Sequence, residues 1–254
     1  MQTSAAARTV LATERLTRAF GGLVAVRDVS ISLDRGELHA VIGPNGAGKS
    51  TLVNLLAGEL PPTAGRIILD GEDVTRQPVH TRAHLGIARS FQRTDIFKSL
   101  SVLENVRLAA QAVTVRASGL LRSPGTDSRS IEQGKAALAR AGLLYGHQRI
   151  AGTLAHGQQR QLEIAMTLAS GPKVLLLDEP LAGMGPEEGE RIAELLRSLA
   201  REHAVLLIEH DMDFVFKVAD RMTVLVEGAV LATGTPAEVR ANAGVQNAYL
   251  GGHA

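Results

Sequence analysis

Short apolar runs and amphipathic segments alternate along most of the chain. Apolar or alternating runs over residues 10–16, 23–33 and 37–42 are separated by glycine or charged residues, which predicts strands. A further strand is expected over 66–69, after a turn at 61–65 that contains prolines and a glycine. The N-terminal part is therefore predicted to be rich in antiparallel β-structure.

The apolar spacing becomes helical over residues 94–170. Helices are expected over 102–112, 131–141 and 158–169, and the glycines and proline at 118–130 predict a loop. Because the chain returns to strands afterwards, this block is expected to form an inserted α-helical lobe.

Strands are expected again over 174–178, 205–209 and 222–226. A helix over 186–202 separates the first two, and it begins with Pro186, a residue favoured at the first helical position. Alternating strands and helices are typical of an α/β core with a largely parallel sheet.

Composition narrows the class of protein. The 254 residues carry 27 basic and 26 acidic side chains, so the net charge of +1 provides no general attraction to nucleic acid. The absence of cysteine excludes disulfides and thiolate metal sites and fits a reducing compartment. Apolar runs such as 174–177 are far shorter than the ~20 residues of a membrane span, and residues 1–9 lack a signal-peptide core. We therefore expect a soluble protein that reaches a membrane only through a partner.

One loop carries a specific chemical signal. Between the strand expected at 39–42 and a helix expected at 50–57, the sequence matches the pattern GxxxxGK[ST]. The matching residues are Gly43, Pro44, Asn45, Gly46, Ala47, Gly48, Lys49 and Ser50.

The chemistry of this loop is phosphate binding. Closely spaced glycines let successive backbone N–H groups turn toward one anion at a helix N-terminus. Lys49 is expected to reach the β- and γ-phosphates, Ser50 to ligate Mg²⁺, and Thr51 to supply a hydroxyl near the α-phosphate. The strand-loop-helix context distinguishes the motif from an ordinary glycine-rich turn.

Two carboxylates end the most apolar strand. The run 174–177 leads directly into Asp178 and Glu179, at the sheet edge where parallel sheets bind ligands. Asp178 is expected to act as a partner of Mg²⁺, and Glu179 is the candidate base that polarises the attacking water.

With both motifs in this order, the chain resembles the ATP-binding subunits of ABC transporters over nearly its whole length. The resemblance implies an α/β fold with a P-loop NTPase (RecA-like) core over 9–93 and 171–234, and an inserted helical lobe over 94–170. Residues 235–254 would then form a C-terminal tail. ATP and Mg²⁺ are the implied cofactors.

The resemblance also assigns roles to single residues. Phe20 matches the aromatic residue on which the family stacks adenine. Gln92 matches the glutamine that reaches Mg²⁺ and the attacking water, and His210 matches the switch histidine at the γ-phosphate. The signature segment, which contacts ATP on a partner subunit, corresponds to Leu154, Ala155, His156, Gly157 and Gln158.

Two segments depart from the family pattern. Ala155 stands where the common signature has a serine, and losing one neutral hydrogen bond weakens such a contact by roughly 0.5–1.5 kcal/mol. His156 is a candidate replacement donor. The crossing loop at 181–186 lacks the aspartate that many members carry.

Further segments of the sequence indicate which subfamily the chain resembles. The runs 20–26, 157–165 and 234–239, with the ending 248–251, look like ATPase subunits of branched-chain or hydrophobic amino-acid importers. The ATPase subunits of urea or short-amide importers are similar in sequence, as are those of lipopolysaccharide exporters. Both remain alternatives. A soluble ABC ATPase of iron–sulfur assembly fits less well.

The resemblance implies a set of partners and a location. These are membrane-spanning permease subunits, a second ATPase subunit (identical or paralogous), and indirectly a solute-binding protein, with no nucleic acid. The protein is expected in the cytoplasm, peripheral on the inner face of the membrane. Residues 93–97, with Ile96 and Phe97, are the expected docking surface.

Overall fold

The computed structural model describes residues 9–90, 95–114 and 128–250. An antiparallel sheet at the N-terminal side has the order β2-β1-β5-β6, with β3 paired to β1. Its strands are β1 (Thr9–Phe20), β2 (Leu23–Val29), β3 (Ser32–Asp34), β5 (Ala64–Leu69) and β6 (Glu72–Asp73). The expected N-terminal antiparallel β region is confirmed.

The single strand expected over 23–33 is divided in two. Between β2 and β3, the Thr13 hydroxyl donates to the Val29 carbonyl at 2.9 Å and accepts from the Ile31 N–H at 3.0 Å. A side chain on β1 thus satisfies backbone groups that would otherwise continue a ladder, and the local pattern of residues 23–33 does not reveal this.

A second sheet has the order β11-β10-β4-β9-β8-β7, and its pairs are parallel except for β10 with β11. The strands are β4 (Leu38–Ile42), β7 (Ile87–Arg89), β8 (Val174–Asp178), β9 (Ala204–Ile208), β10 (Arg221–Val226) and β11 (Ala229–Gly234). All residues of β4, β8 and β9 are buried, as expected for strands covered on both faces. The sequence pattern did not single out β7 or β11.

Alternate residues of this parallel sheet face two different cores. Val41, Leu176 and Leu206 pack with α1 and the antiparallel sheet, whereas Leu175 and Leu207 pack on the opposite side with α6. This follows from the two-residue period of a strand. The sheet is therefore sandwiched, with its strand ends left at the rim.

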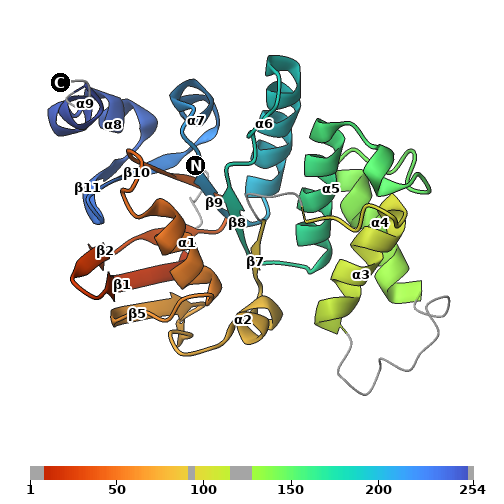
Figure 1. Ribbon diagram of the computed structural model, residues 1–254, viewed down its shortest axis with the longest axis horizontal. Helices are drawn as coiled ribbons and strands as arrows, with labels where there is room; N and C mark the ends of the chain where they lie inside the picture. The colour runs from red at the N-terminus through yellow and green to blue at the C-terminus, as the bar shows by residue number, and fades with distance from the viewer. Residues whose placement is uncertain (1–8, 91–94, 115–127, 251–254) are drawn as a thin grey trace, which may run out of the picture.

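Helices surround the two sheets (Figure 1). Those of the core are α1 (Lys49–Ala57), α2 (Val79–Leu85), α6 (Pro186–Ala200), α7 (Met212–Val218), α8 (Pro236–Ala241) and α9 (Ala243–Leu250). Only α1 and α6 were expected as elements, since the others are short and their amphipathic pattern is weak. In the described part of the chain, no helix combines the length and apolarity needed to cross a membrane.

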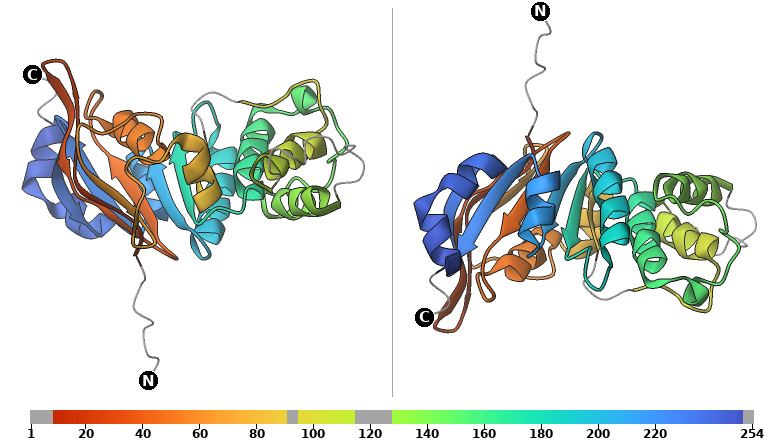
Figure 2. Two further views of the ribbon diagram at one scale, coloured as in Figure 1. Left: turned by 90° about the horizontal axis from the view of Figure 1, so that it is seen from below. Right: turned by 90° about the horizontal axis from the view of Figure 1, so that it is seen from above.

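The expected helical lobe contains α3 (Val102–Thr114), α4 (Ser128–Arg140), the 3₁₀ turn Ala151–Thr153 and α5 (His156–Ala169). Figure 2 shows these helices at one end of the molecule and α8 and α9 at the other. The loop expected over 118–130 ends earlier than predicted, because α4 already begins at Ser128. Ser130 is fully buried, so packing within the lobe extends this helix beyond its local signal.

Candidate functional site

The glycine-rich loop between β4 and α1 has the backbone that phosphate binding requires. Gly43 and Gly48 have φ angles of 154° and 99°. A Cβ on Gly43 would lie 2.1 Å from the Leu225 carbonyl oxygen, and one on Gly48 would lie 2.3 Å from that of Ala25. Only glycine fits at either position, and the loop ends in the N-terminus of α1.

Lys49 lies folded over this loop. Its Nζ donates to the carbonyl oxygens of Gly43 at 2.7 Å and Pro44 at 3.0 Å. Burial lowers the pKa of Lys49, while the carboxylates of Glu179 and Asp178 oppose the shift. The amine is thus close to the two acidic residues at the end of β8, and its charge faces the same space as theirs.

Asp178 and Glu179 differ in environment, as their expected roles require. The Asp178 side chain is 5% exposed and that of Glu179 is 27% exposed. Burial raises the pKa of Asp178, and Arg89 opposes this rise. Glu179 adopts a left-handed φ of 47°, and its N–H donates to the Ile208 carbonyl at 2.9 Å. The more exposed carboxylate, that of Glu179, is the better placed to meet water.

His210 follows β9 and lies beside the same carboxylates. Its Nδ1 is 3.9 Å from Glu179 Oε1 and 3.7 Å from Glu209 Oε2. Glu209 is buried, which raises its pKa, and it accepts the Leu181 N–H at 2.9 Å. The structure thus brings His210 close to Glu179, and it adds Glu209, which the sequence did not single out. A contact of His210 with the γ-phosphate stays a prediction.

Two buried residues of α5 connect the helical lobe to this edge. Arg160 donates to the carbonyls of Asp178 at 3.1 Å and Glu179 at 2.7 Å. Its Nη1 also contacts Glu163 Oε2 at 2.6 Å, and Glu163 Oε1 accepts the Asp95 N–H at 2.7 Å. Their i, i+3 spacing just after the signature segment is the only signal of this contact in the sequence, and the sequence motifs alone do not point to it.

Phe20 ends β1, and the residue is 43% exposed. The Arg18 guanidinium lies over it, with Cζ 4.5 Å from the ring centroid. An exposed ring supported from one side is suited to stacking on the other. The next strand, β2, passes close to the phosphate-binding loop, because Gly48 packs against the Ala25 carbonyl oxygen.

The signature segment forms the start of α5. Leu154 is buried, Ala155 occupies the N-cap with no side-chain acceptor, and Gln158 Oε1 accepts the Ala155 N–H at 3.4 Å. Gly157 is tightly enclosed, since a Cβ there would lie 2.4 Å from Glu188 Oε1.

The expected replacement donor lies beside the crossing loop. The His156 ring is 3.2 Å from the position of a Cβ on Gly183. The signature segment and the crossing loop are therefore in contact at this point, and His156 is exposed there.

Gln92 lies outside the described residues, which end at Ser90 and resume at Asp95. Its expected contact with Mg²⁺ and water stays a prediction. Of the expected docking residues at 93–97, Phe97 is 54% exposed, whereas Ile96 packs against the core. Only one of the two named apolar side chains therefore offers a surface.

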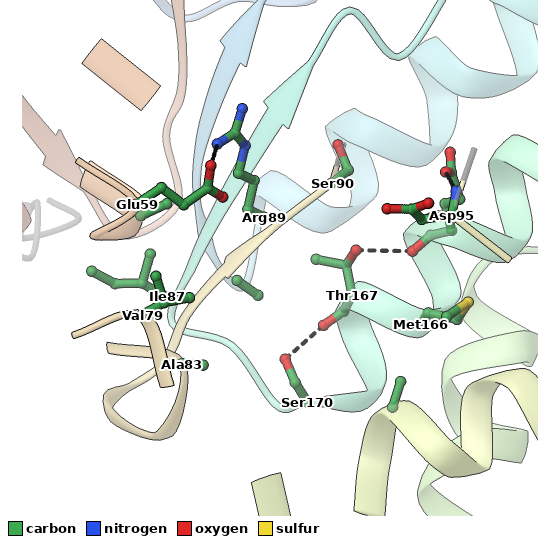
Figure 3. Close-up of a pocket in the computed structure, with 14 residues that line it drawn as sticks. Glu59, Val79, Ala83, Ile87, Arg89, Ser90, Asp95, Met166, Thr167 and Ser170 are labelled. Carbon is green, nitrogen blue, oxygen red and sulfur yellow. Dashed lines mark hydrogen bonds and ion pairs between the residues drawn. The ribbon is translucent and has the colours of Figure 1, made fainter. Parts of the chain in front are cut away.

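A groove lies between the core and the lobe, and Asp95, two residues before Phe97, is part of its lining (Figure 3). Its lining combines apolar side chains from α2, β7 and α5 with charged ones. The apolar members include Val79, Ala83, Ile87 and Met166, and the charged ones are Glu59, Arg89, Asp95 and Glu163.

The donor set suits a nucleotide with Mg²⁺. The Ser50 hydroxyl and the Asp178 carboxylate are oxygen ligands, which Mg²⁺ prefers, and it commonly takes few protein ligands plus phosphates and water. Among the described residues, no group of three His, Cys, Asp or Glu side chains could hold a metal by itself. The site therefore fits an ion held jointly with a nucleotide.

Comparison with known proteins places this geometry in context. A sequence profile of the ABC transporter family matches residues 26–182, and one of the branched-chain amino acid ATP-binding cassette transporter matches residues 229–254. The high-affinity branched-chain amino acid transport ATP-binding protein BraF of Pseudomonas aeruginosa is 41% identical over 251 residues, covering 96% of this chain and 98% of that protein. The high-affinity branched-chain amino acid transport ATP-binding protein LivG of Escherichia coli is 41% identical over 249 residues, covering 95% of this chain and 98% of that protein.

More distant similarity extends to another transport process. The lipopolysaccharide export system ATP-binding protein LptB of Haemophilus influenzae is 31% identical, covering 95% of this chain and 97% of that protein. Among solved structures, the ADP conformation of MJ1267, an ATP-binding cassette of an ABC transporter, superposes with a TM-score of 0.84 at 30% identity. That match covers 96% of this chain and 99% of the other.

Proposed function

Because this chain belongs to the ABC transporter family as an ATP-binding subunit, we propose that it powers an importer of branched-chain or other hydrophobic amino acids. ATP hydrolysis follows from the family. The observation that carries the choice of solute is the 41% identity, over nearly the full length, to proteins that carry out branched-chain amino acid transport. The profile match at residues 229–254 supports the same choice.

The residues at the carboxyl edge of the parallel sheet take separate roles. Backbone N–H groups of the loop after β4 and the Lys49 amine bind the β- and γ-phosphates. Phe20 stacks on adenine, with Arg18 behind its ring. Glu179 takes a proton from the attacking water, and His210, 3.9 Å from Glu179, contacts the γ-phosphate.

Ser50, Asp178 and Gln92 are the residues that would hold Mg²⁺. The bound ion supplies charge stabilisation on the transferred phosphate oxygens. Within the described residues, Ser50 is exposed at the start of α1, and Asp178 is anchored through a carboxylate oxygen by Arg89. The hydroxyl is thus free to turn toward an ion, while the carboxylate has a fixed orientation.

The signature segment serves a second ATPase subunit, so each complete site is shared between two subunits. The start of α5 offers its N-terminal N–H groups to the γ-phosphate held by the partner. Closing two subunits over two ATP molecules, and reopening after hydrolysis, provides the motion that drives transport.

The groove of Figure 3 receives a short helix of a membrane-spanning permease subunit. Its apolar lining suits one face of an amphipathic helix, and the exposed carboxylates of Glu59 and Asp95 suit polar residues beside it. Phe97, two residues after Asp95 of the groove lining, provides an exposed apolar side chain. Such docking places the protein on the inner face of the membrane.

Reconstitution with its permease and solute-binding partners tests this function. We expect leucine or another branched-chain amino acid, added with the binding protein, to stimulate ATP hydrolysis and uptake into proteoliposomes. Glu179→Gln should keep ATP binding and lose ~10²-fold or more of the hydrolysis rate, because the base is removed. Phe97→Asp should weaken recovery of the permease while leaving ATP binding intact.

Four outcomes would contradict the proposal. Stimulation by urea or short amides alone would assign a different importer, and recovery with lipopolysaccharide-export components would assign export. Copurification with a soluble scaffold and no membrane protein would point to iron–sulfur assembly. An unchanged hydrolysis rate in Glu179→Gln would refute the assigned base.

A further inference from the structure

Arg89 connects β7, α1 and β8 at the sheet edge where Asp178 lies. It ends β7, and its side chain is 11% exposed. Nη1 donates to Asn54 Oδ1 at 2.6 Å and lies 2.8 Å from Glu59 Oε2, both at the C-terminal part of α1 or just after it. Nη2 donates to Asp178 Oδ2 at 3.3 Å.

This arrangement fixes the direction of the guanidinium. Because Nη1 is held by two oxygens from the α1 side, the plane of the group can turn little, and Nη2 is delivered to one oxygen of Asp178. A lysine ammonium is a single point donor and cannot span both sides in this way. The contact with Asp178 is therefore directional as well as electrostatic.

The consequence for Asp178 is that its two oxygens become unequal. Oδ2 accepts from Arg89, whereas no described side chain donates to Oδ1. Asp178 is buried at the end of β8, so it has little water to compensate for a wrong orientation. Asn54 and Lys49 belong to the same helix, so α1 and the Asp178 carboxylate are tied into one unit.

We propose that Arg89 is a positioning residue for the Mg²⁺ site: it holds Oδ2 of Asp178 and leaves Oδ1 for the ion or its bound water. The proposal rests on the proposed nucleotide and Mg²⁺ site, and it adds a residue outside the motifs from which that site was recognised. In this proposal Arg89 acts through Asp178 and α1 rather than by direct contact with nucleotide or metal.

The test measures how strongly Mg²⁺ and ADP assist each other in binding to the full chain. ADP is the probe because it is not hydrolysed. The dissociation constant of a fluorescent ADP is measured in EDTA and across a Mg²⁺ titration, for the native chain, Arg89→Lys and Arg89→Met. We expect the EDTA value to stay within about twofold, and the Mg²⁺ midpoint to rise about tenfold, which corresponds to ~1.4 kcal/mol.

A matched control removes an arginine–carboxylate pair elsewhere. Arg66 contacts Glu14 at 2.6 Å on the antiparallel sheet, and both side chains are exposed, so Arg66→Met should leave the Mg²⁺ midpoint unchanged. Asn54→Ala loosens the guanidinium from its other end, and we expect a shift of about threefold in the same direction. That variant keeps the test available if Arg89→Met fails to fold.

A double-mutant comparison separates positioning from general stability. In an Asp178→Asn background, Arg89→Met should add little to the Mg²⁺ midpoint, since the carboxylate to be oriented is gone. A lowered melting temperature with an unchanged Mg²⁺ midpoint would overturn the proposal, as would an equal loss of ADP affinity in EDTA. Absence of ADP binding in the native chain would instead refute the proposed nucleotide site itself.

Discussion

At the scale of single residues, Glu179 combines a strained backbone with a partly exposed carboxylate. A left-handed φ in a residue other than glycine costs of order 1–3 kcal/mol and persists only where neighbours hold it. Here the Glu179 N–H donates to Ile208 and its carbonyl accepts from Arg160. The assigned base is thus held in place through its backbone.

Glu209 gives a pH prediction at the same scale. Burial raises its pKa above the ordinary value of 4.5, so the folded state binds this proton more tightly than the unfolded state does. Its contribution to stability is therefore present below pH 4.5 and is lost as the pH rises through the raised pKa. In Glu209→Gln the side chain does not titrate, so the variant escapes this loss of stability. The difference in melting temperature, variant minus native chain, should therefore increase with pH.

The measurement is a pair of thermal unfolding series from pH 4 to pH 8 without nucleotide. Glu209 accepts the N–H groups of both Leu181 and His210, and glutamine keeps one oxygen that can accept only one of them. The lost hydrogen bond lowers the melting temperature of the variant by the same amount at every pH, so it adds no pH slope. Glu238→Gln serves as control, because that exposed carboxylate has its pKa lowered by Thr235 and its slope should have the opposite sign. A pH-independent difference for Glu209→Gln would contradict the assignment.

At the scale of elements, α1 is held at both ends. Its N-terminus follows Gly48, and its C-terminal carbonyls are bound by a buried arginine from α2. Arg82 donates to Leu55 at 2.6 Å and Leu56 at 2.8 Å, and also to Thr75 at 2.8 Å. A cation at the C-terminus of a helix also offsets the negative end of its dipole.

Arg82→Met should therefore destabilise the protein by roughly 3 kcal/mol, since several buried carbonyls lose a charged donor. The free energy of unfolding from urea titration measures this change. Arg76→Met, at an exposed position in the preceding loop, is the matched control and should shift it by less than about 0.5 kcal/mol. Equal effects of the two variants would show that Arg82 does not act as a cap.

At the scale of the whole molecule, Arg160 and Glu163 attach the helical lobe to the end of β8, where Asp178 and Glu179 lie, and to Asp95. Arg160 binds the backbone of Asp178 and Glu179, while Glu163 binds the backbone of Asp95. Because these contacts come from the helix that carries the signature segment, movement of the lobe and placement of the assigned base are mechanically linked. The same helix lines the groove proposed for the permease.

Ala155 gives a prediction for the two-subunit assembly. Ala155→Ser restores a hydroxyl that can donate to the γ-phosphate held by the partner, worth about 1 kcal/mol at each of two sites. The dissociation constant of the ATP-bound dimer should fall roughly 30-fold. Sedimentation of Glu179→Gln with and without Ala155→Ser measures this fall. Ala243→Ser, a hydroxyl at the start of α9, should change nothing, and equal constants for all three chains would refute the contact.

The chemical groups of the site were readable from the sequence because they lie in continuous motifs. Lys49, Ser50, Asp178 and Glu179 are close to one another through two loops at strand ends, and strand order in a parallel sheet brings such ends together. His210 follows a third strand and was placed by resemblance. For Gln92, outside the described residues, the expectation stays a prediction.

What the sequence by itself determined was the alternation of buried strands and helices, the α/β class with its helical lobe, and the two motifs that mark a nucleotide site. These are local patterns, fixed by side-chain period and by the space glycine leaves. Only the tertiary structure decided that Arg89 meets Asp178, that Glu209 holds the crossing loop, and that Arg82 caps α1. Each of these contacts joins residues from different elements, and burial, rather than local pattern, makes them strong.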